Sequence, residues 1–178
     1  MILTITLNSA IDKVLLLDEL MPGRPMHAHG EVISIGGKGL DSSVVLRHLG
    51  VETVGLAFAA GETGRQLEAL LEQYGIIPDL LWVEGETRTI YVLAESKNKR
   101  ISHVKLGGMR IGQADLSRFL QAYRARLPES GWVICSGSLP ESVPVDYYAQ
   151  LAHEAAECGV PFLLDCPGEA LLAALPYQ

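Results

Sequence analysis

The 178-residue chain has no apolar run near the ~18 residues that cross a membrane, and its start lacks the basic stretch of a secretion signal. Its three cysteines are odd in number and lack CxxC or His-rich spacing, which indicates buried thiols in a reducing compartment. Lys and Arg number 14 against 21 Asp and Glu, and this net charge of −7 argues against nucleic-acid and anionic-membrane partners. We therefore expect a cytoplasmic protein, with room for one local phosphate site.

The hydrophobic pattern predicts one α/β domain. Short apolar runs rich in β-branched residues alternate with segments of helical spacing, an order typical of a parallel sheet covered by helices. The strands are expected at 2–7, 53–60, 132–135 and 161–165. The helices are expected at 42–49, 63–74, 113–127, 144–158 and 168–174.

Two stretches interrupt this alternation, at about 13–35 and 82–106. Each contains strand-like segments with no helix between them, so each should form an antiparallel excursion outside the main sheet. The first excursion carries His27 and His29, which would share one face if 27–35 is a strand. A metal-binding pair is one interpretation of these histidines, and an exposed polar face is the favoured one.

A glycine-rich stretch, Gly36–Gly39, follows a strand-like run and precedes a helix. It lacks the Ser or Thr that follows the lysine of a Walker-type loop, and Ser42 stands where a dinucleotide fingerprint has its third glycine. Backbone amides at a helix N-terminus and the charge of Lys38 would favour an anion. A plain turn with a solvated lysine accounts for the same residues, and local sequence leaves both open.

Polar residues follow two other predicted strands, and an arginine lies within the second excursion. Asp12 could accept hydrogen bonds from two vicinal hydroxyls or from its own turn. Arg88 suits bidentate recognition of a phosphate or carboxylate, but a solvated strand arginine is the alternative. Ser136–Ser138 could form the polar lip of a ligand cleft or a flexible turn.

Taken in order, five motifs resemble the ribokinase-like phosphofructokinase-B family, nearest to 1-phosphofructokinase and tagatose-6-phosphate kinase. They are Leu7–Asp12, Gly36–Gly39, Thr87–Thr89, Ser136–Pro140 and Leu164–Leu171. The resemblance implies a three-layer α/β/α core with a parallel central sheet and a small antiparallel β lid. It also implies ATP-dependent phosphorylation of a ketose phosphate, such as fructose 1-phosphate or tagatose 6-phosphate.

The resemblance further implies a substrate-binding set consisting of Asp12, Gly36, Gly37, Lys38, Gly39, Asp41, Arg88, Ser136, Gly137 and Ser138. In it, Asp12 would hold sugar hydroxyls, while Lys38 and Arg88 would clamp the phosphate already on the substrate. The family usually has asparagine at the positions of Asp41 and Ile90, and a glutamate-and-proline stretch at 106–109. An aspartate beside a phosphate removes two donors and adds negative charge, so it should weaken anion binding.

Two family motifs find no match within residues 1–178: the Asn-and-Glu motif near magnesium and the Gly-Ala-Gly-Asp motif that carries the catalytic base. We therefore assign no catalytic or metal-binding residue here, and ATP and Mg²⁺ are expected only for the complete family fold. One hypothesis is the substrate-binding portion of a kinase whose base lies beyond Gln178. The other is a non-catalytic sugar-phosphate-binding or interaction protein. An incomplete sheet would expose an edge, so we expect self-association through that edge or the lid.

Overall fold

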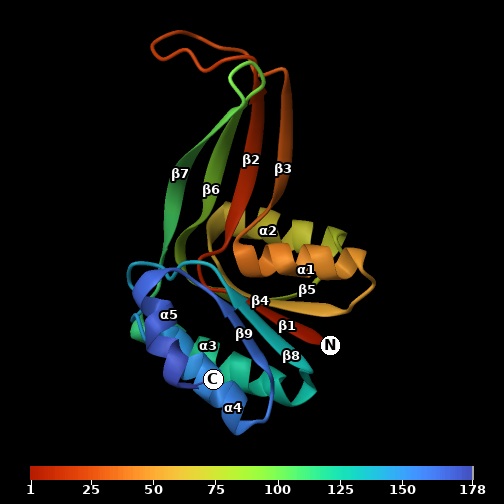
Figure 1. Ribbon diagram of the computed structural model, residues 1–178, viewed down its shortest axis with the longest axis vertical. Coiled ribbons are helices and arrows are strands. Elements are labelled where there is room, and N and C mark those ends of the chain that lie inside the picture. The colour runs from red at the N-terminus through yellow and green to blue at the C-terminus, as the bar shows by residue number, and fades with distance from the viewer. Residues whose placement is uncertain (178) are drawn as a thin grey trace.

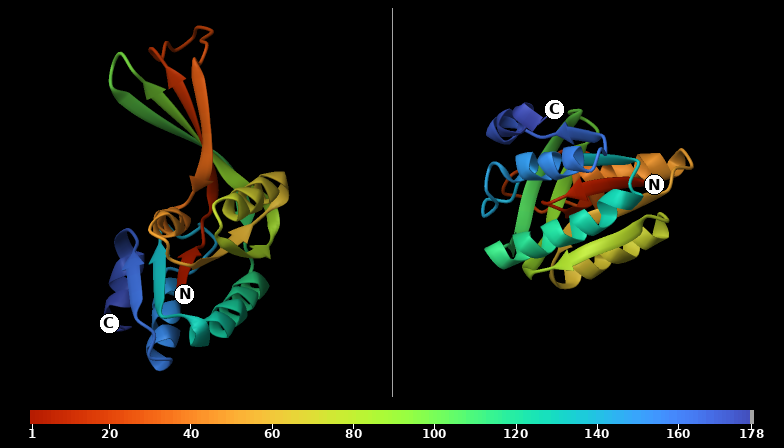
Figure 2. Two further views of the ribbon diagram at one scale, coloured as in Figure 1. Left: turned by 90° about the vertical axis from the view of Figure 1, so that its right-hand side faces the viewer. Right: turned by 90° about the horizontal axis from the view of Figure 1, so that it is seen from below.

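The computed structural model describes residues 1–177 and consists of a layered α/β body with a long β-sheet projecting from one end (Figure 1). The body contains a five-stranded sheet in the order β5-β4-β1-β8-β9, and the projection contains a four-stranded sheet in the order β3-β2-β6-β7. We call the second sheet the lid. Side views show that the lid extends away from the body and does not lie across it (Figure 2).

All strand pairs of the body sheet are parallel. Its strands are β1 (Ile2–Thr6), β4 (Thr53–Ala59), β5 (Ile77–Trp82), β8 (Trp132–Ser136) and β9 (Phe162–Asp165). Central strands of such sheets are covered on both faces and carry continuous apolar runs. β4 follows this rule, since all of its residues are buried.

The helices cover the two faces of the body sheet (Figure 2). One face carries α1 (Lys38–His48) and α2 (Gly61–Gln73), and the other carries three further helices. The latter are α3 (Gln113–Arg126), α4 (Tyr147–Glu157) and α5 (Gly168–Ala174), with 3₁₀ turns η1 (Leu127–Glu129) and η2 (Leu175–Tyr177). None of the helices in the described part of the chain is both long and apolar enough to cross a membrane.

Each face of the sheet has its own apolar core. The larger core joins Leu3, Ile5 and Phe58 of the sheet to Phe119 of α3 and Tyr148 of α4, all with no exposed surface. The smaller core packs Leu40, Leu67 and Leu71 of α1 and α2 against residues that include Ile11 and Ile35 of the lid strands. The smaller core therefore extends under the root of the lid and fixes its position relative to the body.

The lid consists of two hairpins, β2 (Ala10–Leu17) with β3 (Gly30–Gly36) and β6 (Glu84–Glu95) with β7 (Arg100–Arg110). Each hairpin is antiparallel, as expected, but β2 and β6 pair in parallel, so the lid is a mixed sheet. The parallel pair arises because the chain returns from the body between the two hairpins and enters β6 from the same end as β2 (Figure 1).

Three local predictions were wrong. Trp82 ends β5 in the body sheet and does not belong to the second excursion, because the run from Ile77 pairs with β4. His27 and His29 precede β3 and share no strand face; His29 Nδ1 lies 3.8 Å from Asp18 Oδ1. Of the three cysteines, Cys158 is exposed, since it follows the last turn of α4.

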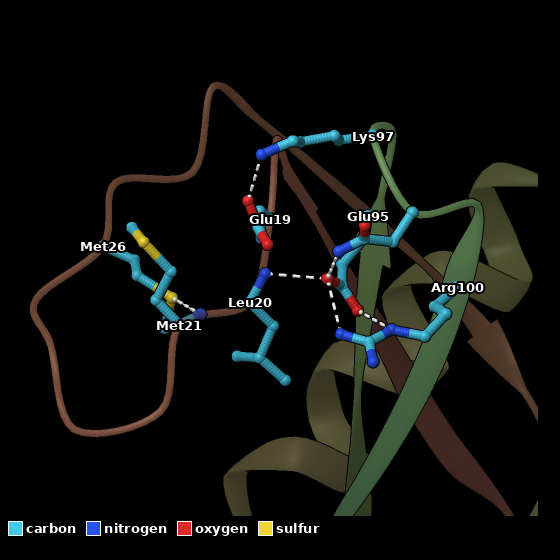
Figure 3. A network of polar contacts seen from close by, with 8 residues as sticks. Glu19, Leu20, Met21, Met26, Glu95, Lys97 and Arg100 are labelled. Carbon is cyan, nitrogen blue, oxygen red and sulfur yellow. Dashed lines mark hydrogen bonds and ion pairs between the residues drawn. The ribbon is translucent and has the colours of Figure 1, made fainter.

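A polar network holds the far end of the lid together (Figure 3). The side chain of Glu95 has no exposed surface and accepts hydrogen bonds from Arg100, Asn98 and the Leu20 amide, all at 2.8–2.9 Å. The hydrogen bonds from Arg100, Leu20 and Asn98 stabilise the carboxylate more than its desolvation destabilises it, so the pKa of Glu95 falls to about 2. Beside it, Lys97 Nζ lies 2.6 Å from Glu19 Oε2.

A second set of hydrogen bonds joins the root of the lid to α2. The buried Thr87 hydroxyl accepts the Ala60 amide at 2.9 Å, and the Thr87 amide donates to the Ala60 carbonyl at 3.0 Å. The Glu86 carboxylate accepts the Thr63 amide at 3.2 Å and the Thr63 hydroxyl at 2.9 Å. Glu86 thereby satisfies a free amide at the start of α2 and ties β6 to the body.

Candidate functional site

The Gly36–Gly39 loop lies where the lid meets the body, between the end of β3 and the start of α1. Gly37 has φ of 104°, a conformation that favours glycine. Gly39 packs so closely on β1 that a Cβ there would lie 2.1 Å from the Ile5 carbonyl oxygen. Thr6 Oγ1 accepts the Leu40 amide at 2.9 Å, so the first turn of α1 is bonded directly to β1.

Lys38 extends from this loop toward the carboxyl ends of β8 and β9. Its Nζ lies 3.2 Å from Asp165 Oδ2, and the Ser136 hydroxyl donates to the same oxygen at 2.9 Å. These two hydrogen bonds and the Lys38 charge lower the pKa of Asp165. Gly137 follows Ser136, and its amide donates to the Asp165 carbonyl at 2.9 Å.

On the lid side of the junction, Arg88 and Asp12 lie on neighbouring strands. Arg88 of β6 is directly opposite Ala10 of β2, two residues before Asp12. Arg88 donates through Nη2 to the Asn8 carbonyl at 2.5 Å, and Asn8 Nδ2 donates to the Ser138 hydroxyl at 3.2 Å. Asn8 therefore connects the lid side of the site to the loop after β8.

Two buried polar atoms at this junction have no hydrogen-bond partner: Asp12 Oδ1 and Arg88 Nε. One is an acceptor and the other a donor. Burial raises the pKa of Asp12, although the charges of His103 and Arg88 act in the opposite direction. Burial likewise lowers the pKa of Arg88, opposed by the charge of Asp12. Native proteins usually pair such groups, so the two atoms together indicate a ligand that accepts one hydrogen bond and donates another.

Asp41 lies in the first turn of α1 and is exposed at the edge of the site. The surrounding protein still excludes enough water from its carboxylate to raise the pKa, and the negative charge of Asp12 adds to this, giving a value of about 6. Near neutral pH, Asp41 thus adds a negative charge to the side of the site that should receive an anion.

A cavity of about 1010 Å³ opens beside Arg88, between the root of the lid, the start of α3 and the loop after β8. Its lining includes Asn8, Arg88 and Lys105 but neither Lys38 nor Asp165. The structure thus separates the predicted residues into a lid-side group around Arg88 and a body-side group around Lys38. It shows no hydrogen bond or ion pair between Lys38 and Arg88.

The sequence prediction omitted three residues that the structure brings into the site. Asn8 was noted only as part of a polar cluster, and His103 and Lys105 only as part of a strand. The sequence signal for His103 and Lys105 was their spacing of two residues, which places both side chains on one face of β7. That face becomes relevant only when β6 and β7 pair beside β2, and local sequence does not contain this pairing.

The body is a parallel sheet covered by helices, with polar groups gathered at the carboxyl ends of its strands, which is where α/β proteins of this class place their ligand sites. The pfkB family carbohydrate kinase model matches residues 3–177, and the chain belongs to this family. The resemblance inferred from the five motifs is confirmed.

The chain is similar to a 1-phosphofructokinase of Xanthomonas campestris pv. campestris, with 36% identity over 177 residues, 97% of this chain and 54% of the relative. It is 33% identical over 178 residues to a D-tagatose-1-phosphate kinase of Bacillus licheniformis, covering 100% of this chain and 57% of the relative. The second name specifies tagatose 1-phosphate, whereas the motifs suggested tagatose-6-phosphate kinases. The chain thus spans about half the length of these curated relatives.

Among solved structures, a protein of Thermotoga maritima described as a possible 1-phosphofructokinase superposes with a TM-score of 0.93 at 29% identity. The match covers 98% of this chain and 56% of that one. The ribokinase-like α/β fold with a parallel central sheet, expected from the sequence, is thereby confirmed.

Proposed function

We propose that residues 1–178 form a single, incomplete α/β domain that supplies the substrate-binding portion of an ATP-dependent ketose-phosphate kinase. The observation that carries this proposal is the pair of buried, unpartnered atoms at the lid root, Asp12 Oδ1 and Arg88 Nε. A sugar hydroxyl would donate to the former, and a phosphate oxygen would accept from the latter. The names of the curated relatives agree with this ligand class.

The residues present hold and orient the substrate. Asp12 would bind sugar hydroxyls, the Gly36–Gly39 loop would border the sugar, and the Ser136–Ser138 segment would line the cleft floor. A carboxylate occupied by two hydroxyls is a poor base for a third, so we assign Asp12 no proton transfer. Phosphoryl transfer depends mainly on such positioning of the acceptor hydroxyl and on charge neutralisation.

ATP is the expected phosphate donor, with Mg²⁺. Among residues 1–177 no three His, Cys, Asp or Glu side chains gather closely enough to hold a metal ion.

Calorimetric titration with fructose 1-phosphate and with fructose tests the proposal. Arg88→Ala should weaken binding of the phosphosugar at least about tenfold while changing fructose binding little, because the lost donor faces the phosphate. Arg65→Ala provides a matched control, since Arg65 is exposed on α2, where it pairs with exposed Glu62. Equal losses for both sugars would contradict a phosphate role for Arg88.

A non-catalytic sugar-phosphate-binding protein is the second candidate, favoured by the negative charge that Asp41 places near Asp12. Binding of a ketose phosphate without ATP-dependent formation of a bisphosphate would select this candidate. Product formation would select the kinase.

We also propose self-association through the lid or the edge at β9. The lid exposes Ile101, Val104 and Leu106 of β7 at 52–66%, and Leu163 and Leu172 are exposed near β9 at 47% and 65%. Uncovered strand edges and apolar side chains favour pairing with another copy. Sedimentation velocity over a range of concentrations should show a dimer or larger species. A monomer at every concentration would contradict self-association.

A further inference from the structure

Lys105 of β7 shares a sheet face with the two buried unpartnered groups. It lies directly opposite Ile90 of β6, and Ile90 lies directly opposite Asp12 of β2. Residues directly opposite each other project from the same face, so Lys105 and Asp12 project together. Arg88, two residues before Ile90, projects from this face as well.

The strand geometry brings the cationic groups of Lys105 and Arg88 within reach of one ligand. The β6–β7 register shifts between Glu86 and Thr89, so Arg88 has no directly opposite partner on β7, but Arg88 and Lys105 both line the same cavity. Gly107 lies next to Arg88, since a Cβ on Gly107 would be 3.6 Å from the Arg88 Cα. Gly107 therefore adds no side chain beside the Arg88 backbone, and it lines the same cavity as the two cations.

One other cation of this cavity is already paired. Arg118 pairs with Asp115 at 3.0 Å and also donates to the Trp82 carbonyl. Arg110 lies directly opposite the acidic Glu84 in the strand register. Glu141 belongs to the loop after β8.

The side chain of Lys105 makes no hydrogen bond or ion pair within residues 1–177, and Arg88 retains its buried unpaired Nε. Lys105 and Arg88 therefore both have unused donors in this cavity, as does Arg110 at its other side.

Lys38 is differently placed. It does not line the cavity, and its ammonium group is bonded to Asp165, which also accepts from Ser136. To meet an anion beside Arg88, it would have to leave this carboxylate.

We propose that Lys105, together with Arg88, binds the phosphate group of the ketose phosphate and so determines specificity for a phosphorylated substrate. This inference rests on the proposed function. In this assignment the cation that binds the phosphate together with Arg88 is Lys105, whereas the sequence motifs implied Lys38. The ligand class is a phosphate monoester, whose dianion accepts from a guanidinium and an ammonium group at once.

Titration calorimetry of the wild type and of Lys105→Met, Lys38→Met and Lys13→Met tests this assignment, with fructose 1-phosphate, fructose and inorganic phosphate as probes. Lys13 is the matched control, because it neighbours Asp12 on β2 and projects from the opposite face. Lys105→Met should raise the Kd for fructose 1-phosphate about tenfold and leave fructose unchanged. Lys38→Met should change the Kd for fructose 1-phosphate less than about threefold, and Lys105→Arg should retain binding of fructose 1-phosphate.

The outcomes separate this inference from the function on which it rests. One outcome is that fructose 1-phosphate binds, that Lys105→Met has no effect and that Lys38→Met weakens binding. In that case the proposed function stands and the Lys105 assignment is overturned. If inorganic phosphate binds through Lys105 but neither sugar binds, the assignment stands and the function fails. If the wild type binds none of the probes, both are overturned. Unchanged melting temperatures would show that the variants are folded.

Discussion

The two sheets differ in how their strands are held. Every residue of β4 in the body sheet is buried, whereas no residue of β7 in the lid is buried. The body therefore derives its stability from apolar burial on both faces of the sheet. The lid has little such burial beyond its root and relies on polar groups at its two ends, Glu95 at the tip and Thr87 at the root.

This difference bears on function, because the candidate site lies where the two modes of stabilisation meet. Its body side, from Gly39 to Ser136, is fixed by close packing and short hydrogen bonds. Its lid side carries the unpartnered atoms of Asp12 and Arg88. Both residues lie at the lid root, which the smaller core holds against the body, whereas the lid beyond the root has few buried apolar contacts and can open locally at low free-energy cost.

The largest expected effect comes from removing a side chain of the body core. Phe58 is fully buried, and its ring centroid lies 4.8 Å from that of Phe119. Phe58→Ala should lower the free energy of unfolding by about 3–5 kcal/mol, because it leaves a cavity in a packed core. Urea denaturation measures this change.

Ile101 of the lid is the control for Phe58, since it is 66% exposed. Ile101→Ala should change the unfolding free energy by no more than about 0.5 kcal/mol. A loss as large as that of Phe58→Ala would break the contrast between the sheets and show that the lid face is covered in solution.

A smaller, local effect is expected from Glu95. Its folded pKa of about 2 is below the ordinary value of 4.5, so its carboxylate stabilises the lid tip fully above about pH 4.5, and this contribution is lost as the pH falls toward 2. Hydrogen exchange at the Leu20 amide should therefore show less protection in acid. Glu95→Gln should reduce protection about tenfold already at pH 7 and abolish the acid dependence.

Glu31→Gln on β3 is the matched control for Glu95, because Glu31 is exposed and its side chain makes no hydrogen bond or ion pair in the described part of the chain. The same loss of protection in both variants would refute a specific role for the Glu95 network.

Much of the fold followed from local sequence. The predicted strands at 2–7, 53–60, 132–135 and 161–165 correspond to β1, β4, β8 and β9, because buried parallel strands are continuous apolar runs. The strand β5 was missed because Pro78 and Asp79 interrupt its apolar pattern, and its pairing with β4 overrides that local signal. The parallel contact of β2 with β6 joins residues 78 positions apart, such as Ala10 and Arg88, and no local pattern records it.

The site was predicted less completely than the fold. Motif positions made Asp12, Lys38 and Arg88 candidates, but the pairing of Lys38 with Asp165 depends on where β9 lies beside β8. Lys105 has no motif of its own, and its relation to Arg88 arises only from strand register. Residue identity therefore indicated the chemistry of the site, while tertiary structure determines which side chains share it.

The close packing of Gly39 on β1 also affects the entropy of binding. With Gly39 against the Ile5 carbonyl and Leu40 bonded to Thr6, this loop is ordered before any ligand arrives. A ligand would then immobilise mainly the long side chains of Arg88 and Lys105, at about 0.5–1.5 kcal/mol each. Affinity in such a preorganised site is governed by the residence time of the complex more than by how often it forms.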